Sequence, residues 1–187
     1  VNTMNKIETL EKEGVYYAFP MMVPQGKFNI EVAGSVISPN KDQIPGSCRD
    51  WYSVQSWLNI SNQEFGITWS SREVPVVSLC DINTGKLLDD LKILNTSFFA
   101  YLMNNYWNNN FKESQGGKLT FRFSITSGEE QKKTAKAARF GWNYRTPLIS
   151  RILKPKTYNI STLSTYSFLQ IDDEAVILLT LKQAENK

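Results

Sequence analysis

Histidine is absent from this sequence of 187 residues. Histidine is the commonest general base near neutral pH and the commonest protein ligand of zinc. A catalytic triad that depends on histidine is therefore excluded for this chain, and so is a metal site with a histidine ligand. A pair of carboxylates that act as acid and base needs no histidine, so that chemistry stays open.

Cysteine is scarce, with Cys48 and Cys80 as the two examples. A sequence does not fix the distance between two thiols, so a disulfide and two free, mostly buried thiols both stay open. Long apolar runs are missing too, since none reaches the roughly 18 residues that a transmembrane helix needs. The first residues lack the basic stretch and apolar core of a signal peptide. We therefore expect no membrane partner.

Charge of one sign is not in excess, because 21 basic and 18 acidic residues leave a formal net charge of +3. This balance is too even to indicate a nucleic-acid partner or an anionic membrane surface. Hydrophobic residues make up 41% and aromatic residues 12% of the chain. A chain of this size and composition is expected to bury a core and to form one domain, residues 1–187.

Turn signals separate short apolar or alternating stretches along most of the chain. Lys118–Ile125 alternates most clearly, with Phe121 and Phe123 on one face and Arg122 on the other. The fold class predicted from this pattern is mainly all-β, an antiparallel β-sandwich. The stretches expected to form strands are 15–20, 27–32, 51–60, 65–70, 74–79, 98–103, 118–125, 166–169 and 175–181.

One short helix is expected near residues 128–140. Ser127 and Glu130 have the spacing of a capping box, and Gly141 is placed to end the helix. Residues 87–94 show a weaker helical spacing of leucines. A long loop is expected over 35–48, and loops of that length inside a compact domain are often functional.

The stretch 96–124 is predicted to be a long hairpin that joins the strands 98–103 and 118–125. Its connection is rich in asparagine and carries Tyr106 and Trp107. Asparagine favours turns, and aromatic rings beside amides suit a sugar-contacting surface. The alternative interpretation is that these rings cap the core.

Three separated motifs resemble one known family. The first is Met-Asn-Asn-Tyr-Trp at 103–107, followed by Ser-Gln-Gly-Gly at 114–117 and Phe-Arg-Phe-Ser-Ile at 121–125. The second is Gln-Ile-Pro-Gly-Ser-Cys-Arg-Asp-Trp-Tyr-Ser-Val-Gln at 43–55, and the third is the tail 168–185. The residues of these motifs and their order along the chain resemble the C-terminal β-rich region of family-38 glycoside hydrolases, the α-mannosidase type. None of the motifs is a catalytic signature.

The resemblance implies a non-catalytic β-sandwich domain, excised from a longer multidomain enzyme. No cofactor is expected in this chain, and zinc is expected in the missing catalytic domain. The partners implied are that catalytic domain, from the same parent chain, and mannosides. The domain would support the catalytic domain and complete the rim of the sugar pocket.

Carbohydrate-binding residues are expected where the motifs carry polar and aromatic side chains together. A guanidinium and a carboxylate offer donors and acceptors for sugar hydroxyls, and a ring face offers stacking. The opposing interpretation is that Arg49 and Asp50 pair with each other and that Trp51 fills the core. The candidate residues are Arg49, Asp50, Trp51, Tyr52, Tyr106 and Trp107; no catalytic or metal-ligating residue is predicted.

Two other functions stay open, an autonomous carbohydrate-binding module and a structural or interaction β-sandwich. The positions of the aromatic residues discriminate between them. A flat exposed row of rings favours the module, buried rings favour a structural role, and rings on one exposed apolar face favour a contact between domains. The carboxylates of Asp50, Glu64, Glu73 and Asp81 are acid–base candidates, although a surface carboxylate is usually only solvated.

Overall fold

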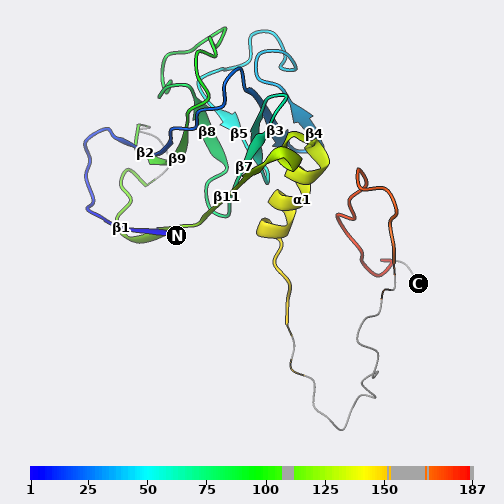
Figure 1. The fold of residues 1–187 in the computed structure, drawn as a ribbon. Coiled ribbons are helices and arrows are strands. Elements are labelled where there is room, and N and C mark those ends of the chain that lie inside the picture. Colours follow the sequence, from blue (N-terminus) through cyan, green and yellow to red (C-terminus); the bar gives the residue numbers. More distant parts are fainter. Residues whose placement is uncertain (107–111, 151, 153–166, 168, 186–187) are drawn as a thin grey trace.

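The protein folds as a mainly β, sandwich-like structure with one α-helix among its described residues (Figure 1). The computed structural model describes residues 1–106, 112–150, 152, 167 and 169–185. The strands are β1 Asn2–Lys6, β2 Gly14–Phe19, β3 Lys27–Val32, β4 Ser35–Ile37, β5 Tyr52–Ser53, β6 Leu58–Ser61, β7 Gly66–Ser71, β8 Val76–Leu79, β9 Phe98–Asn104, β10 Gly117–Phe121 and β11 Phe123–Gly128. A 3₁₀ turn η1, Glu129–Lys132, precedes helix α1, Thr134–Arg145.

The strands form three antiparallel sheets, which confirms the predicted fold class. The five-stranded sheet has the order β11-β7-β6-β3-β4, and the four-stranded sheet has the order β2-β9-β8-β5. A third sheet contains only β1 and β10. The strands are short, from two to seven residues, and pair as antiparallel neighbours.

The core lies between the two larger sheets. Phe28 and Leu58 from the five-stranded sheet and Val77 and Phe98 from the four-stranded sheet belong to one buried cluster. The ring of Trp69 on β7 lies 5.4 Å from the ring of Phe98 on β9, in an edge-on arrangement. Such aromatic contacts add to the free energy gained by area burial.

Helix α1 and the turn η1 cover the outer face of the five-stranded sheet. Asn59 and Thr68 are neighbours on β6 and β7, and both side chains bond to Gln131 of η1. In α1, Gly141 lies against Trp57, where an added Cβ would come within 2.6 Å of the Trp57 Cβ. A glycine is therefore needed inside this helix for close packing, and the prediction that Gly141 ends the helix is wrong.

The predicted start of the helix is also wrong. Residue Ser127 lies in β11, η1 occupies the first predicted turn, and α1 begins at Thr134 with no side-chain cap. The capping-box spacing fails here because pairing with β7 keeps the backbone extended through Gly128. The helix runs to Arg145, two residues before Pro147.

The predicted hairpin over 96–124 is wrong, because its two strands lie in different sheets. Strand β9 pairs with β2 and β8, whereas β10 pairs with β1 and β11 pairs with β7. Periodicity reports which face of a strand is buried, but not which strand is its neighbour. The predicted strand 118–125 breaks at Arg122, although Phe121 and Phe123 do pack inward while Arg122 pairs outside with Glu73.

The stretch 51–60 is two strands rather than one. Strand β5 belongs to the four-stranded sheet and β6 to the five-stranded sheet. Between them the chain crosses the sandwich, and the amides of Val54 and Gln55 bond to Pro75 and Glu31. Because the chain changes sheets, the alternation of faces does not continue, and the neighbours Trp57 and Leu58 are both buried.

Two further predicted elements do not form. Residues 87–94 are not helical, because Leu87, Leu88 and Leu91 donate their backbone N–H groups to side chains elsewhere. The proposed final strand 175–181 is irregular, and Arg139 of α1 binds the carbonyl oxygens of Glu174 and Val176. Of its predicted partner 166–169, residues 166 and 168 lie outside the described residues. The predicted loop 35–48 holds, except that 35–37 forms β4.

Neither cysteine is in a disulfide: Cys48 is exposed and Cys80 is half-buried. Their thiols are therefore free, though less buried than expected. Searched over the described residues, no helix is long and apolar enough to cross a membrane.

Candidate functional site

A cleft of about 620 Å³ opens beside the end of β9, and aromatic rings form much of its wall. We call it the aromatic cleft. Its volume falls in the range of small-molecule sites, roughly 300–1,000 Å³. A second hollow of about 680 Å³ is lined by the acid–base candidate Glu64, but by no aromatic ring and by none of the predicted carbohydrate-binding residues. The aromatic cleft is lined by Trp51, Pro75, Val76, Thr84, Gly85, Leu87, Tyr101, Leu102, Met103, Asn104 and Tyr106.

Strand β9 supplies the floor of the cleft. Residue Ala100 is fully buried in the core, so the next residue, Tyr101, points to the opposite face of the sheet. Its ring stacks on that of Tyr16 in β2, at 4.4 Å between centroids and 7° between planes. The ring of Trp51 lies 6.3 Å from the ring of Tyr101. Three rings from distant parts of the sequence thus form one continuous surface.

Residue Tyr106 stands at the end of β9, where its backbone N–H bonds to the side chain of Asn104 at 3.3 Å. The residue is 40% exposed. The ring lies against the backbone of Gly14, where an added Cβ would come within 3.2 Å of a Tyr106 ring carbon. Glycine at position 14 therefore makes room for the tyrosine ring.

The opposite wall is the segment 81–88, which we call the wall loop. Thr84, Gly85 and Leu87 line the cleft from it. Gly85 has a φ of 81°, a left-handed conformation that favours glycine, and the backbone N–H of Lys86 closes a turn onto Asn83 at 3.0 Å. The hydroxyl of Thr84 bonds to that of Tyr16, which joins the wall to the floor.

Asp50 fixes the far end of the wall loop. Its carboxylate is fully buried and accepts hydrogen bonds from the backbone N–H groups of Leu87 at 3.0 Å and Leu88 at 2.8 Å. Leu87 has a φ of 53°, an unfavourable conformation for a leucine, and these bonds hold it there. The carboxylate of Asp50 thus positions the cleft wall and does not pair with Arg49.

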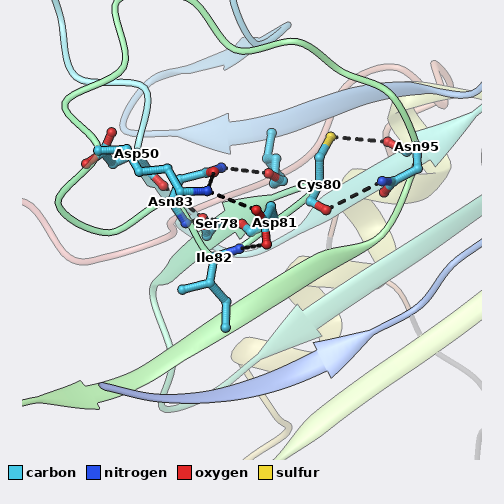
Figure 2. A network of polar contacts seen from close by, with 9 residues as sticks. Asp50, Ser78, Cys80, Asp81, Ile82, Asn83 and Asn95 are labelled. Carbon is cyan, nitrogen blue, oxygen red and sulfur yellow. Dashed lines mark hydrogen bonds and ion pairs between the residues drawn. The ribbon is translucent and has the colours of Figure 1, made fainter. Parts of the chain in front are cut away.

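A buried network fixes the near end (Figure 2). The hydroxyl of Ser78 lies 2.9 Å from the carbonyl oxygen of Asp50 and 2.7 Å from that of Asp81, and it accepts the backbone N–H of Asn83 at 3.1 Å. The side-chain amide of Asn83 donates to the carbonyl oxygen of Leu79 at 2.9 Å. Because Ser78 and Asn83 are buried, these bonds form away from water and hold the loop firmly.

The carboxylate of Asp81 points away from this network and lies at the surface. Its carboxylate accepts hydrogen bonds from the Lys86 ammonium group and the Ile82 backbone, and these contacts lower the pKa of Asp81. Glu73 is likewise occupied by Arg122. Glu64 lies at the exposed turn between β6 and β7. The structure does not bring the four candidate acid–base residues together into one cleft.

Arg49 and Tyr52 lie in the interior rather than in the cleft. The guanidinium group of Arg49 donates to the Ser47 hydroxyl at 2.9 Å, and only 5% of the residue is exposed. Tyr52 packs in the core, where burial raises the pKa of its phenol to about 12. The interpretation that Trp51 fills the core is wrong, since it lines the cleft.

The predicted site residues therefore divide into groups. Trp51 and Tyr106 meet at the aromatic cleft, Asp50 supports its wall, and Trp107 lies outside the described residues. Trp57 and Trp69 are each 1% exposed, so they form no exposed row of rings. Sequence reasoning missed Tyr16 and Tyr101, whose sheet pairing alone places them beside Trp51. The Asn-Thr-Gly turn at 83–85 was the visible signal for the wall loop.

The described residues do not place side chains that could bind zinc close to one another. Searched over those residues, the structure contains no group of three or more His, Cys, Asp or Glu side chains that could hold a metal ion. The residues present do not fit the zinc site of the resembled family.

Comparisons with protein-family models, with curated proteins and with solved structures find no match to this chain.

Proposed function

We propose that this chain is a non-catalytic β-sandwich domain of an α-mannosidase-like glycoside hydrolase, and that it supports the catalytic domain and contributes to its carbohydrate-binding surface. The observation that carries the proposal is the convergence of two of the family-like motifs. Trp51 comes from the motif 43–55, while Met103 and Tyr106 come from the motif 103–107, and all three line one cleft. Motifs that are distant in sequence and meet at one concave surface favour a shared binding role.

The chemistry of the cleft and of its rim supports a glycoside ligand. Sugars present C–H faces that pack on aromatic rings, and their hydroxyls bond to uncharged polar groups. Trp51 and Tyr106 supply partly exposed rings, and Asn104 supplies an amide at the rim. The fixed wall loop keeps this surface formed in advance, which lowers the entropy cost of binding.

The proposal assigns catalysis to another domain of the parent enzyme. Asp50 is engaged by two backbone amides, Glu73 by Arg122 and Asp81 by Lys86, so each of these carboxylates has a structural partner. The zinc ion of the resembled family would belong to the catalytic domain. The role of this chain is to bind and orient.

The test uses the full-length enzyme that the proposal implies. We expect Trp51→Leu to lower kcat/KM for an α-mannoside about tenfold, or ~1.4 kcal/mol of transition-state binding. Tyr144→Leu is a matched control, because Tyr144 is a partly exposed ring on α1, outside the cleft. Folded Trp51→Leu enzyme with unaltered kinetics contradicts the proposal.

A further inference from the structure

The surface of the aromatic cleft is mainly apolar, and its polar groups are uncharged. Eight of the residues that line it are Trp51, Pro75, Val76, Leu87, Tyr101, Leu102, Met103 and Tyr106, and the remaining ones are Thr84, Gly85 and Asn104. The hydroxyls of Thr84 and Tyr16 bond to each other. Burial and a hydrogen bond to Tyr16 also raise the pKa of Tyr101, which keeps that phenol neutral.

This composition does not suit a sugar ring lying fully inside the cleft. A hexose carries a hydroxyl on most of its carbons, and each buried hydroxyl without a partner costs roughly 1–3 kcal/mol. The Thr84 hydroxyl bonds to Tyr16, and the Asn104 side-chain oxygen accepts the backbone N–H of Tyr106. The polar groups that these bonds leave, chiefly the Asn104 amide N–H groups, the Trp51 indole and the Tyr106 phenol, are too few to pair with every hydroxyl of an enclosed hexose. An apolar ring, by contrast, replaces water against Trp51 and Leu87 without leaving polar groups unpaired.

The cleft is also uncharged. Every described residue that lines it is neutral, and the nearby Lys86 forms an ion pair with Asp81. A phosphate or carboxylate placed here would lose its hydration without meeting a cation, which is strongly unfavourable. The occupant must therefore be neutral as well as apolar.

We propose that the aromatic cleft binds the aglycone side of a glycoside, as an uncharged aromatic or similarly flat apolar group, and leaves the sugar at the rim beside Asn104. The glycoside part rests on the proposed function. The aryl group lies against Trp51 and Tyr106, and Leu87 on the wall loop closes the opposite side.

The experiment compares phenyl α-mannoside with methyl α-mannoside by ligand-observed NMR on the whole chain. We expect phenyl α-mannoside to bind at least about tenfold more tightly, as stacking a ring on aromatic side chains allows. Trp51→Leu and Tyr106→Leu remove this difference, and Tyr144→Leu retains it. Phenyl phosphate, which has the ring but carries charge, binds more weakly than phenyl α-mannoside. Circular dichroism checks that each variant is folded.

The outcomes separate this inference from the proposed function. Equal affinity for the two mannosides overturns the inference and leaves the proposed function standing. Phenyl β-glucoside that binds as tightly as phenyl α-mannoside supports the inference and counts against a mannoside domain. Absence of binding by every glycoside overturns the inference together with the carbohydrate-contacting part of the proposed function. The wild-type comparison decides the question even if a variant fails to fold.

Discussion

At the scale of single residues, Asp50 shows how a candidate contact can act indirectly. A carboxylate beside a tryptophan in a family-like motif predicts a direct hydrogen bond to a sugar hydroxyl. The structure buries it instead and uses both of its oxygens to bind the wall loop. The polar character of Asp50 was visible in the sequence. Its partners, 37 and 38 positions away, depend on the fold.

The first prediction follows from this burial. Asp50→Ala leaves two backbone N–H groups without acceptors and should lower the free energy of unfolding by about 2–4 kcal/mol. Asp50→Asn keeps one acceptor oxygen and should cost less. Denaturant titration measures both, with Asp81→Asn as the surface control because Asp81 is exposed. Equal small losses in all three variants would show that Asp50 does not hold the loop.

The second prediction concerns pH. Burial raises the pKa of Tyr52 to about 12, above the value of 10.0 that an exposed tyrosine has. Because the folded state disfavours the phenolate, the stabilising effect is complete below pH 10 and is lost as pH rises towards 12. Wild-type stability should fall more steeply across this window than that of Tyr52→Phe, measured by urea titration at each pH. Parallel curves for the two proteins would contradict the assignment.

At the scale of elements, alternation predicted which residues face the core but not which strands are neighbours. Phe121 and Phe123 face inward as expected, yet they belong to strands in different sheets. Local spacing also misplaced the end of the helix. Gly141 lies inside the helix, where a side chain would clash with Trp57. Such facts depend on contacts between residues far apart in the chain, which periodicity does not contain.

The third prediction tests the packing of β11. The ring of Phe123 lies 5.2 Å from Phe19 and 5.8 Å from Trp69, between the two sheets. Phe123→Ala should cost about 2–3 kcal/mol of stability, since truncating a partly buried phenylalanine that packs on the core leaves a cavity. Ile125→Ala is the matched control on the same strand, because Ile125 is 46% exposed. If the melting temperature of Phe123→Ala is unchanged, the strand is wrongly placed.

The fourth prediction concerns the packing of α1 against Trp57. Gly141→Ala adds a methyl group that meets the Trp57 side chain at 2.6–2.9 Å. Overpacking typically costs 1–3 kcal/mol, while alanine regains up to about 1 kcal/mol of helix propensity, so a net loss is expected. Thr134→Ala, at an exposed position of the same helix, should be neutral or stabilising. A more stable Gly141→Ala protein would show that α1 packs less closely than described.

At the scale of the whole molecule, the sandwich was predictable and the site only in part. Short alternating stretches and frequent turns indicate an antiparallel sandwich with no need for long-range information. The motifs identified Trp51 and Tyr106 as candidates, whereas the stack of Tyr16 on Tyr101 arises only when β2 pairs with β9.

The chain is expected to hydrolyse no α-mannoside by itself, with or without zinc. A 4-nitrophenyl α-mannoside assay checks this, and turnover that a carboxylate substitution in this chain abolishes would contradict it.

The most direct test of the central claim follows the tryptophan indole N–H signals by NMR during titration with phenyl α-mannoside. Trp51 lines the cleft. Trp142 lies on α1, outside the cleft, and its indole N–H donates to the Glu31 carboxylate at 2.7 Å. The Trp51→Leu spectrum assigns the first signal. We predict that the Trp51 signal shifts in a saturable manner while the Trp142 signal stays in place. A titration that leaves Trp51 unchanged, or that moves only Trp142, would contradict a carbohydrate-binding role for the aromatic cleft.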